Sequence, residues 1–261
     1  MNCKAYTFGL ALVLCSQWNP SALSQATPSN PSPLELLESA RECEVQHRDS
    51  EALALYHKVL QAEPDQFDAL CAASYLHGQV GKRLRKSARE QHYQQALELA
   101  ERALKQRPDD PESNFVMAWS CGGIAMISGV REKAQLARKI RDRIGITLEK
   151  DPSHHRAWYV LANWYYKIAD ANFLERAAAR LLFGGLPQGV SFEKAASAYQ
   201  KAIQLRPNFI LYHYELALAL CKVGKKGEAL KQLEYASGLD PLTPDDPATI
   251  VACNKLMREL R

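Results

Sequence analysis

Residues 195–207 read AASAYQKAIQLRP, and this stretch decides the fold. Its skeleton is Ala195, Tyr199, Ala202 and Pro207, and the first three positions lie on one face of a helix. The small residues let a neighbouring helix approach closely, while the bulky residue between them fills the remaining space. Proline then ends the helix, because it lacks an N–H and disfavours the α conformation at the preceding residue.

The same skeleton recurs along the chain. Its other copies are Ala52, Tyr56, Val59 and Pro64; Ala96, Ala100, Ala103 and Pro108; Ala229, Leu233, Ala236 and Pro241; and, more weakly, Ile140, Ile144, Thr147 and Pro152. The step from Pro207 to Pro241 is 34 residues, the period of a tetratricopeptide repeat (TPR). The residues expected to cap the helices that follow four of these prolines are Asp65, Asp109, Ser153 and Asn208.

The leading helix of each pair has its own signature. Trp158, Leu161, Ala162 and Tyr165 come close to the Trp, Leu-Gly, Tyr pattern of a TPR. We therefore predict an all-α, TPR-like solenoid over 34–261. Its five helix pairs are expected at 34–66, 67–110, 111–154, 155–209 and 210–243, with a capping helix at 244–260 opened by Thr243 and Pro244.

Three repeats are longer than 34 residues. Pro64 to Pro108 and Pro108 to Pro152 are each 44 residues, and Pro152 to Pro207 is 55. The first insertion is the basic segment Gly81–Arg89. The last has enough apolar residues for an additional short helix, namely Phe173, Leu174, Leu181, Leu182 and Phe183.

The N-terminus is expected to lie outside the fold. Lys4 precedes an apolar run that ends at Cys15, and Ala22-Leu23-Ser24 is an acceptable cleavage site, so 1–24 reads as a signal peptide. The alternatives are a frayed terminus and a lipoprotein at Cys15, the latter disfavoured by the bulky residue before that cysteine. Residues 25–33 are predicted to be a flexible leader. We thus expect export to the periplasm or cell envelope of a bacterium.

The chain resembles the regulator of microtubule dynamics family and its bacterial TPR relatives. The residues that carry the resemblance are Trp158–Trp164, Phe183-Gly-Gly-Leu-Pro187, Tyr199 through Phe209, and Tyr212–Leu216. The resemblance covers roughly Leu34 to Pro241, and the long spacer with its Leu-Pro is the specific part. It implies a helical repeat domain without catalytic residues, and in eukaryotic members an association with microtubules or organelle membranes. An export signal departs from that setting.

No catalytic, cofactor or metal motif is recognisable in the sequence. His154-His155 is read as a surface turn between two repeats. The five cysteines after residue 24 lie in apolar helical stretches and are expected to be small buried residues, with one disulfide left open. We therefore expect a protein that binds other proteins and is not an enzyme. The net charge of +4 is too small to indicate nucleic acid as the main partner.

The concave surface of a repeat stack is the expected binding surface. By resemblance, five positions of each leading helix face it: Tyr75, Phe115, Trp119, Arg156, Tyr159, Asn163, Tyr166, Lys167, Tyr214 and Lys222. Such aromatic and cationic residues suit a peptide or a helix of a partner protein. Trp158, Leu161 and Tyr165 are expected instead to pack between helices.

Two basic segments, Lys82–Arg89 and Arg131–Arg143, are interpreted as solvated outer faces, with contact to an anionic membrane surface or an acidic partner as the alternative. The alternative function is an adaptor at an anionic membrane surface, which would use Lys82–Arg89 and the apolar spacer, or a cytoskeletal adaptor as in the eukaryotic family.

Overall fold

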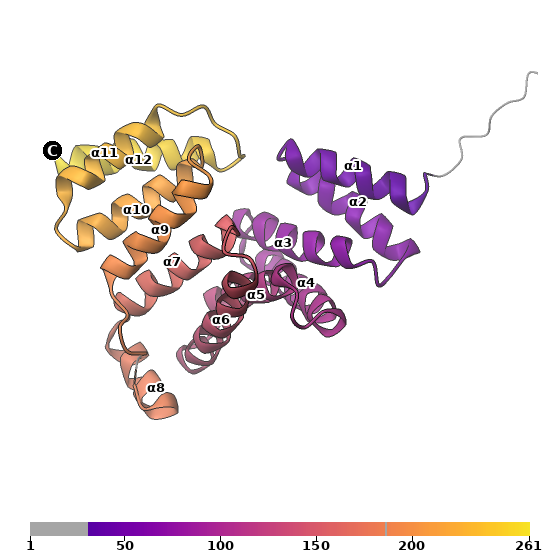
Figure 1. Ribbon diagram of the computed structural model, residues 1–261, viewed down its shortest axis with the longest axis horizontal. Helices are drawn as coiled ribbons and strands as arrows, with labels where there is room; N and C mark the ends of the chain where they lie inside the picture. Colours follow the sequence, from indigo (N-terminus) through magenta and orange to yellow (C-terminus); the bar gives the residue numbers. More distant parts are fainter. Residues whose placement is uncertain (1–30, 186) are drawn as a thin grey trace, which may run out of the picture. The chain divides into compact units, whose positions relative to one another are not determined.

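The computed structural model describes residues 31–185 and 187–261, so the predictions for the signal peptide and for Cys15 lie outside the described residues. The described part is helical throughout and contains no strand (Figure 1). Its helices are α1 Pro33–Val45, α2 Asp49–Ala62, α3 Phe67–Arg83, α4 Lys86–Gln106, α5 Pro111–Ile127, α6 Val130–Lys150, α7 His155–Ala169, α8 Phe173–Phe183, α9 Phe192–Leu205, α10 Ile210–Lys222, α11 Lys226–Ser237 and α12 Asp246–Leu260. None of them combines the length and apolarity that crossing a membrane requires.

The helices pair as the repeat predicts. The partners are α1 with α2, α3 with α4, α5 with α6, α7 with α9, and α10 with α11, while α12 packs on the last pair. The additional helix expected in the last insertion is α8. The fold is therefore an all-α repeat solenoid. The capping helix begins at Asp246 and not at Pro244, because the Asp246 carboxylate accepts the backbone N–H of Leu242 (2.8 Å) and of Thr243 (2.7 Å), which keeps those residues in a turn.

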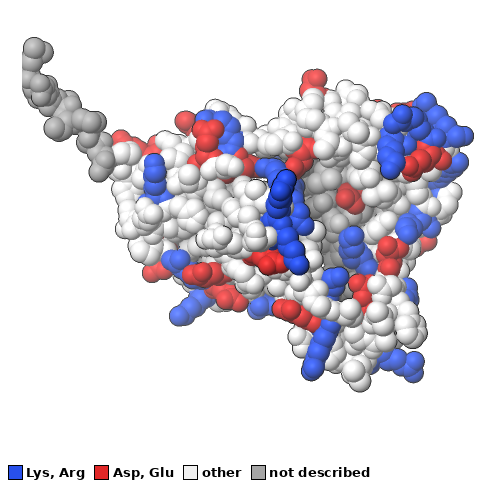
Figure 2. Space-filling model, turned by 180° about the vertical axis from the view of Figure 1, so that it is seen from behind, with Lys and Arg blue, Asp and Glu red and all other residues white. Residues whose placement is uncertain are grey.

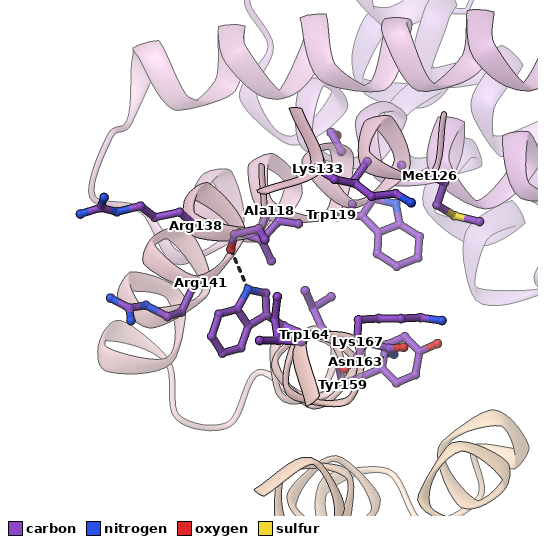
Figure 3. Close-up of a pocket in the computed structure, with 18 of the residues that line it drawn as sticks. Ala118, Trp119, Met126, Lys133, Arg138, Arg141, Tyr159, Asn163, Trp164 and Lys167 are labelled. Atoms are coloured by element: carbon purple, nitrogen blue, oxygen red, sulfur yellow. Dashed lines mark hydrogen bonds between the residues drawn. The ribbon is translucent and has the colours of Figure 1, made fainter. Parts of the chain in front are cut away.

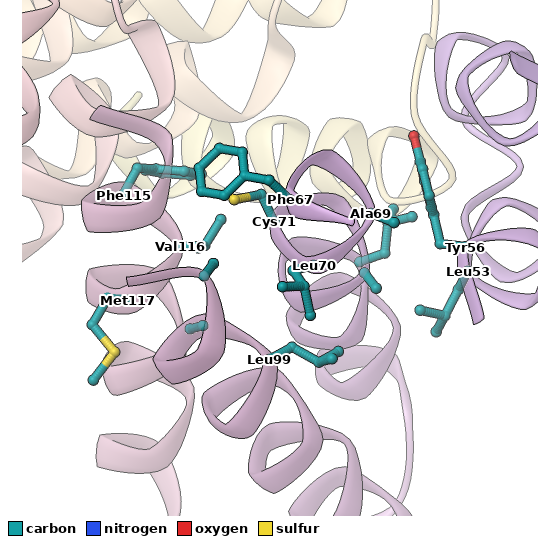
Figure 4. Close-up of a cluster of buried hydrophobic side chains, with 14 of the residues drawn as sticks. Leu53, Tyr56, Phe67, Ala69, Leu70, Cys71, Leu99, Phe115, Val116 and Met117 are labelled. Atoms are coloured by element: carbon teal, nitrogen blue, oxygen red, sulfur yellow. The ribbon is translucent and has the colours of Figure 1, made fainter. Parts of the chain in front are cut away.

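The repeated small face is the inner surface of the stack. Ala195, Tyr199 and Ala202 are completely buried, and the same holds for the alanine positions of the other copies. Figure 4 shows the layer that forms around the second and third repeats, where Leu70 and Phe67 of α3 lie near Val116 of α5. Buried apolar residues form two clusters, one over α1–α6 and one over α9–α12, and α7 contributes to both: Ala157 and Trp164 to the first, Ala162 to the second.

Four helices, α2, α4, α6 and α9, end two residues before a proline. The residues before these prolines, Glu63, Arg107, Asp151 and Arg206, have left the α region, with ψ between 79° and 88°. Each pre-proline carbonyl then accepts the N–H of the third residue beyond it, at 3.1 to 3.4 Å, which closes a β-turn with proline in its favoured second position.

This turn places each N-cap one residue later in the chain than the sequence predicts. Asp65, Asp109, Ser153 and Asn208 occupy the third turn position, so the prediction that they cap the next helices is wrong. The N-caps are Gln66, Asp110, His154 and Phe209, and the first three accept a backbone N–H of the first turn through a side-chain atom.

The first insertion lengthens α3 and α4 and supplies a long-range contact. The Arg83 guanidinium donates to both carboxylate oxygens of Asp245 (2.8 and 3.0 Å) and to Asp49 (2.7 Å). Lys82 also reaches Asp245, at 2.7 Å. Burial opposes ionisation of Asp245, but the hydrogen bonds from Arg83 and Lys82 outweigh it and lower the pKa of this carboxyl. We call this contact the Arg83–Asp245 bridge; it joins the second repeat to the turn before α12.

The described cysteines are free thiols. Four of them are buried and Cys221 is half-buried. Burial raises the pKa of Cys121 and of Cys253 to about 11, so both stay protonated at neutral pH, in line with small core residues.

Three histidines form a hydrogen-bonded chain across α2, α3 and α4. The Nε2 atoms of His57 and His77 are 2.8 Å apart, and the Nδ1 atoms of His77 and His92 are 3.0 Å apart. Each contact needs one protonated and one bare nitrogen, which neutral rings can supply. Burial, reinforced by the two neighbouring histidines, lowers the pKa of His77 to about 3, and burial lowers the pKa of His57 and His92 as well.

The buried alanine contact generates the first prediction. Ala202→Leu should overpack the seam between helices and lower the free energy of unfolding by ~1–3 kcal/mol. Lys201→Ala, one position along at an exposed site, is the control and should change it little. Urea denaturation of the two variants measures the difference, and equal small effects would contradict the helix register described above.

The histidine chain generates the second prediction, a loss of stability in acid. Unfolded histidine has a pKa of about 6.5, so below that pH the histidine of the unfolded state binds a proton. Folded His77 does not bind one until the pH is much lower. The stabilisation is present above about pH 6.5 and is lost as the pH falls, by roughly 2 kcal/mol at pH 5 from His77 alone. Urea melts at pH 7.5 and pH 5 measure this loss.

His77→Gln should remove the share of that pH dependence that comes from His77, whatever it does to stability at pH 7.5. His155, whose pKa burial lowers to about 4, retains a share of its own. His47→Asn is the control, because asparagine tolerates the positive φ of 54° at that position and the chain of three histidines stays intact. A pH dependence in His77→Gln as steep as in the unmodified protein would rule out the assignment.

Candidate partner-binding groove

A groove with a volume of about 1030 Å³ opens along the leading helices. Residues of α3, α5, α7 and the start of α10 line it, and α6 and α8 form one side. In Figure 3, Trp119 of α5 lies across this space from Trp164, Asn163 and Tyr159 of α7, with Arg138 and Arg141 of α6 at one end.

The groove floor is an aromatic cluster centred on Arg156. Its guanidinium lies 4.4 Å from the ring centre of Tyr75 and 5.0 Å from that of Phe115, within cation–π range. Trp119 packs beside Tyr75, with ring centres 5.3 Å apart, and donates its indole N–H to the Tyr75 carbonyl at 3.2 Å. Gly78 makes this approach possible, since a Cβ there would lie 2.1 Å from the Trp119 indole nitrogen.

Glu112 holds the Arg156 guanidinium in place. One carboxylate oxygen accepts from Arg156 at 3.1 Å, and the other lies 3.0 Å from Nε2 of His154. Burial disfavours the charged carboxylate, but the His154 hydrogen bond and the Arg156 charge outweigh burial and lower the pKa of Glu112. Tyr75, Glu112 and Arg156 come from three successive repeats, so these contacts fix the relative placement of the repeats that form the floor.

Tyr159 lines the groove but is also packed. Its ring stacks on Tyr212, with centres 5.0 Å apart and planes inclined by 23°, and lies 6.1 Å from Tyr199. Burial raises the pKa of the Tyr159 hydroxyl well above its usual value. Tyr212 is held in turn by Nδ1 of His155, 2.8 Å from its hydroxyl. Tyr159 is therefore part of the rigid wall and not a free aromatic side chain.

The side formed by α5, α6 and α7 is apolar. Trp164 is 6% exposed and donates its indole N–H to the Ala137 carbonyl at 2.6 Å, which joins α7 to α6. Met126, at the end of α5, is 67% exposed and lies at the edge of the groove. A ligand can thus bury apolar surface here without displacing a packed core residue.

Cations surround this apolar side. Lys133, Arg138 and Arg141 of α6 and Lys167 of α7 line the groove, whereas its carboxylates are Asp170 and Glu175. Lys133 pairs with Glu175 at 3.7 Å, while exposed Lys167 has no ion pair among the described residues. In the space-filling view, Lys and Arg side chains border a recess on the face shown (Figure 2).

The interpretation of Arg131–Arg143 as only a solvated outer face is therefore wrong, because one side of α6 borders the groove. The basic insertion Lys82–Arg89 also differs from a free cationic surface. Lys82 and Arg83 belong to the Arg83–Asp245 bridge, and Arg89 donates to the Leu84 carbonyl at 3.0 Å.

Seven of the ten predicted groove residues lie at the groove: Tyr75, Phe115, Trp119, Arg156, Tyr159, Asn163 and Lys167. Of these, Phe115 is completely buried in the first core cluster and offers a ligand no exposed surface. The other three predicted residues lie elsewhere. The Tyr166 ring packs edge-on against Phe192, with centres 5.3 Å apart; Tyr214 packs against the second core cluster; and Lys222 pairs with Asp170 at 2.7 Å.

Of the side chains expected to pack between helices, Trp158, Leu161 and Tyr165 all contact the core clusters. The surface-turn reading of His154 is wrong, because this residue is 9% exposed and caps α7. In the described ranges, no group of three or more His, Cys, Asp or Glu side chains is arranged to hold a metal ion.

Sequence reasoning did not find the contribution of α6, α8 and Met126 to the groove. The one available signal was the amphipathic pattern of α6, in which Ala134, Ala137 and Ile140 alternate with the cations. That pattern predicts a buried face but does not tell which other helices that face meets.

Comparisons with known proteins agree with this architecture. A thermophilic TPR protein from Thermus thermophilus has a similar fold, with a TM-score of 0.64 and 15% identity, over 86% of this chain and 100% of that one. Regulator of microtubule dynamics protein 3 of Rattus norvegicus is 28% identical over 153 residues, 58% of this chain and 32% of the rat protein. The Xenopus laevis protein 3 is 24% identical over 215 residues, 81% of this chain and 46% of that protein.

The chain thus matches about a third to a half of the length of these relatives. A sequence profile described as Regulator of microtubule dynamics protein 1-3 matches residues 36–261, from within α1 to the end of the described chain. With its TPR-like fold and this match over most of its length, the chain belongs to the regulator of microtubule dynamics family.

Proposed function

We propose that this protein is a non-catalytic scaffold that binds an acidic segment of a partner protein in the groove, in the cell envelope of a bacterium. The observation that carries the proposal is the composition of the groove, an aromatic floor and an apolar side bordered by cations. TPR-like folds present such surfaces to peptides and helices. The export signal read from residues 1–24 supports the location.

The chemistry of the groove supports a partner segment with two properties. An apolar or aromatic anchor would bury the exposed surface near Met126 and Trp119, since a few large anchors supply most of the binding energy at protein interfaces. Carboxylates beside the anchor would meet Lys167, Arg138 and Arg141. Of these three, Lys167 and Arg141 are the most suitable for mutation, because Arg138 also stacks over Phe183 at 5.6 Å.

The floor supports binding without a large rearrangement. Glu112, Arg156 and Tyr75 hold one another across three repeats, and Tyr159 is stacked on Tyr212. A groove whose walls are already ordered loses little conformational entropy when a ligand binds. An ordered groove therefore favours one defined class of peptide segment as the ligand, and not a range of unrelated partner surfaces.

A cytoskeletal adaptor is the alternative that the name of the relatives implies. The cationic border of the groove would also suit an acidic filament surface. Co-sedimentation with microtubules that is lost when Lys167 and Arg141 are reversed in charge would favour this alternative. Export of the chain would argue against it.

The groove generates the third prediction. A phage-displayed library of random peptides, selected on the purified protein, should yield sequences that combine Asp or Glu with an aromatic or large apolar residue. The double variant Lys167→Glu/Arg141→Glu should bind these peptides at least ~10-fold more weakly, about 1.4 kcal/mol. Isothermal titration calorimetry measures the change, and binding by the unmodified protein should weaken with added salt.

The matched control is Lys105→Glu/Lys201→Glu, which reverses two exposed cations outside the groove and changes the net charge equally. Its affinity should equal that of the unmodified protein. Selection of basic or purely apolar peptides, or equal loss in the two double variants, would contradict the proposed site.

A further inference from the structure

Helix α8 is inserted between the two helices of the fourth repeat, and its ends are defined by local interactions. Asn172 and Glu175 form a capping box, with reciprocal backbone bonds of 3.1 and 3.0 Å. At the other end Gly184 has φ 76°, and the N–H groups of Gly184 and Gly185 return to the carbonyls of Arg180 and Ala179. The helix therefore forms at this position although it packs mainly on one neighbour, α6.

The inner side of α8 accounts for that packing. Ala179 is 6% exposed, and Glu175, Ala179 and Phe183 line the groove. Glu175 is the only carboxylate of the helix and pairs with Lys133. The acidic group and the small buried residue thus both face the body of the protein.

The outer side of α8 is apolar and exposed. Phe173 is 82% exposed, Leu174 65% and Leu181 86%. At 100° per residue, these three and exposed Ala177 fall within an arc of about 100°. Exposed Arg180 lies beside the Phe173 edge of this arc. Arg176 follows it, but its guanidinium donates to the carbonyls of Ala171 (2.8 Å) and Ala169 (3.3 Å) and so holds α8 to the end of α7. In Figure 2 the α8 projection, at the lower right, is largely white with Lys or Arg beside it.

This concentration of large exposed apolar residues differs from the rest of the described chain. The others are spread over α1, α5, α6, α9, α11, α12 and the turn before α12, and single exposed apolar residues are ordinary. A continuous stripe on a helix of eleven residues calls for a surface that covers it.

We propose that α8 docks on an anionic lipid surface, lying flat with Phe173, Leu174 and Leu181 among the headgroups. An apolar arc with arginine at its edge is the pattern of an interfacial helix. The Arg180 guanidinium can reach lipid phosphates while its methylene stem stays beside the apolar arc. No acidic side chain of α8 faces outward to oppose this contact.

The same features disfavour a second copy of the chain as the covering surface. A two-fold contact through this stripe would bring the Arg180 side chains of both copies together, so like charges would meet. The stripe of one short helix is also much smaller than the roughly 800 Å² that each partner buries in a stable protein interface. A bilayer needs neither a complementary shape nor a minimum area. The proposal does not depend on the peptide groove.

Vesicle flotation with the full-length protein tests the proposal. The protein should float with vesicles of phosphatidylglycerol and phosphatidylcholine and not with phosphatidylcholine alone. F173S/L181Q and R180E should each lower the apparent affinity at least ~10-fold. Because Phe173, Leu181 and Arg180 are all exposed, urea melts of both variants should match the unmodified protein. V251Q, which removes an apolar side chain 67% exposed on α12, is the control and should float normally.

Three outcomes would overturn the proposal. The first is no flotation of the unmodified protein with anionic vesicles. The second is flotation that F173S/L181Q retains in full. The third is concentration-dependent dimerisation, seen by analytical ultracentrifugation, that F173S/L181Q abolishes, because it would assign the stripe to a second copy.

Discussion

The close approach of helices through alanine is the constraint on which the structure depends. Ala195, Ala202 and their equivalents are completely buried, so the second helix of each pair presents almost no side chain at the points of contact. A leading helix can then lie against it with its own large residues free to face the groove. The aromatic floor of the groove can form because the alanine residues behind it already provide the close contact between the two helices. The groove is thus a consequence of the same spacing that makes the repeats stack.

The sequence predicted most of the architecture, since helix periodicity and proline are local signals. The helix pairs and the inserted helix could be located from residue spacing alone. The positions of Asp65, Asp109, Ser153 and Asn208 were misjudged, because cap preference says nothing about the β-turn that each proline closes. Capping could have been assigned correctly only by counting the turn residues between two helices.

The groove was harder to predict than the helices. Arg156 could be placed on the concave face from its position in the repeat, but its partners Tyr75, Phe115 and Glu112 come from other repeats. The α6 cations looked like solvent-facing charges, because one helix in isolation does not reveal which neighbours leave its edge open. Tyr166 and Lys222 were misplaced where the long spacer and α8 interrupt the regular repeat. Contacts between repeats are long-range information that the repeat pattern does not contain.

The Arg83–Asp245 bridge has a consequence for how the repeat domain unfolds. In a simple solenoid each repeat contacts only its neighbours, so an end can fray while the remainder stays intact. Here Asp245, just before the last helix, is tied to Arg83 in the second repeat, 162 residues away in sequence. Detaching α12 therefore removes a partner from Arg83 of α3, the same residue that holds Asp49 at the start of α2. Terminal fraying is coupled to loosening of the opposite end, which makes the unfolding of this domain more cooperative than the stacking of its repeats alone would provide.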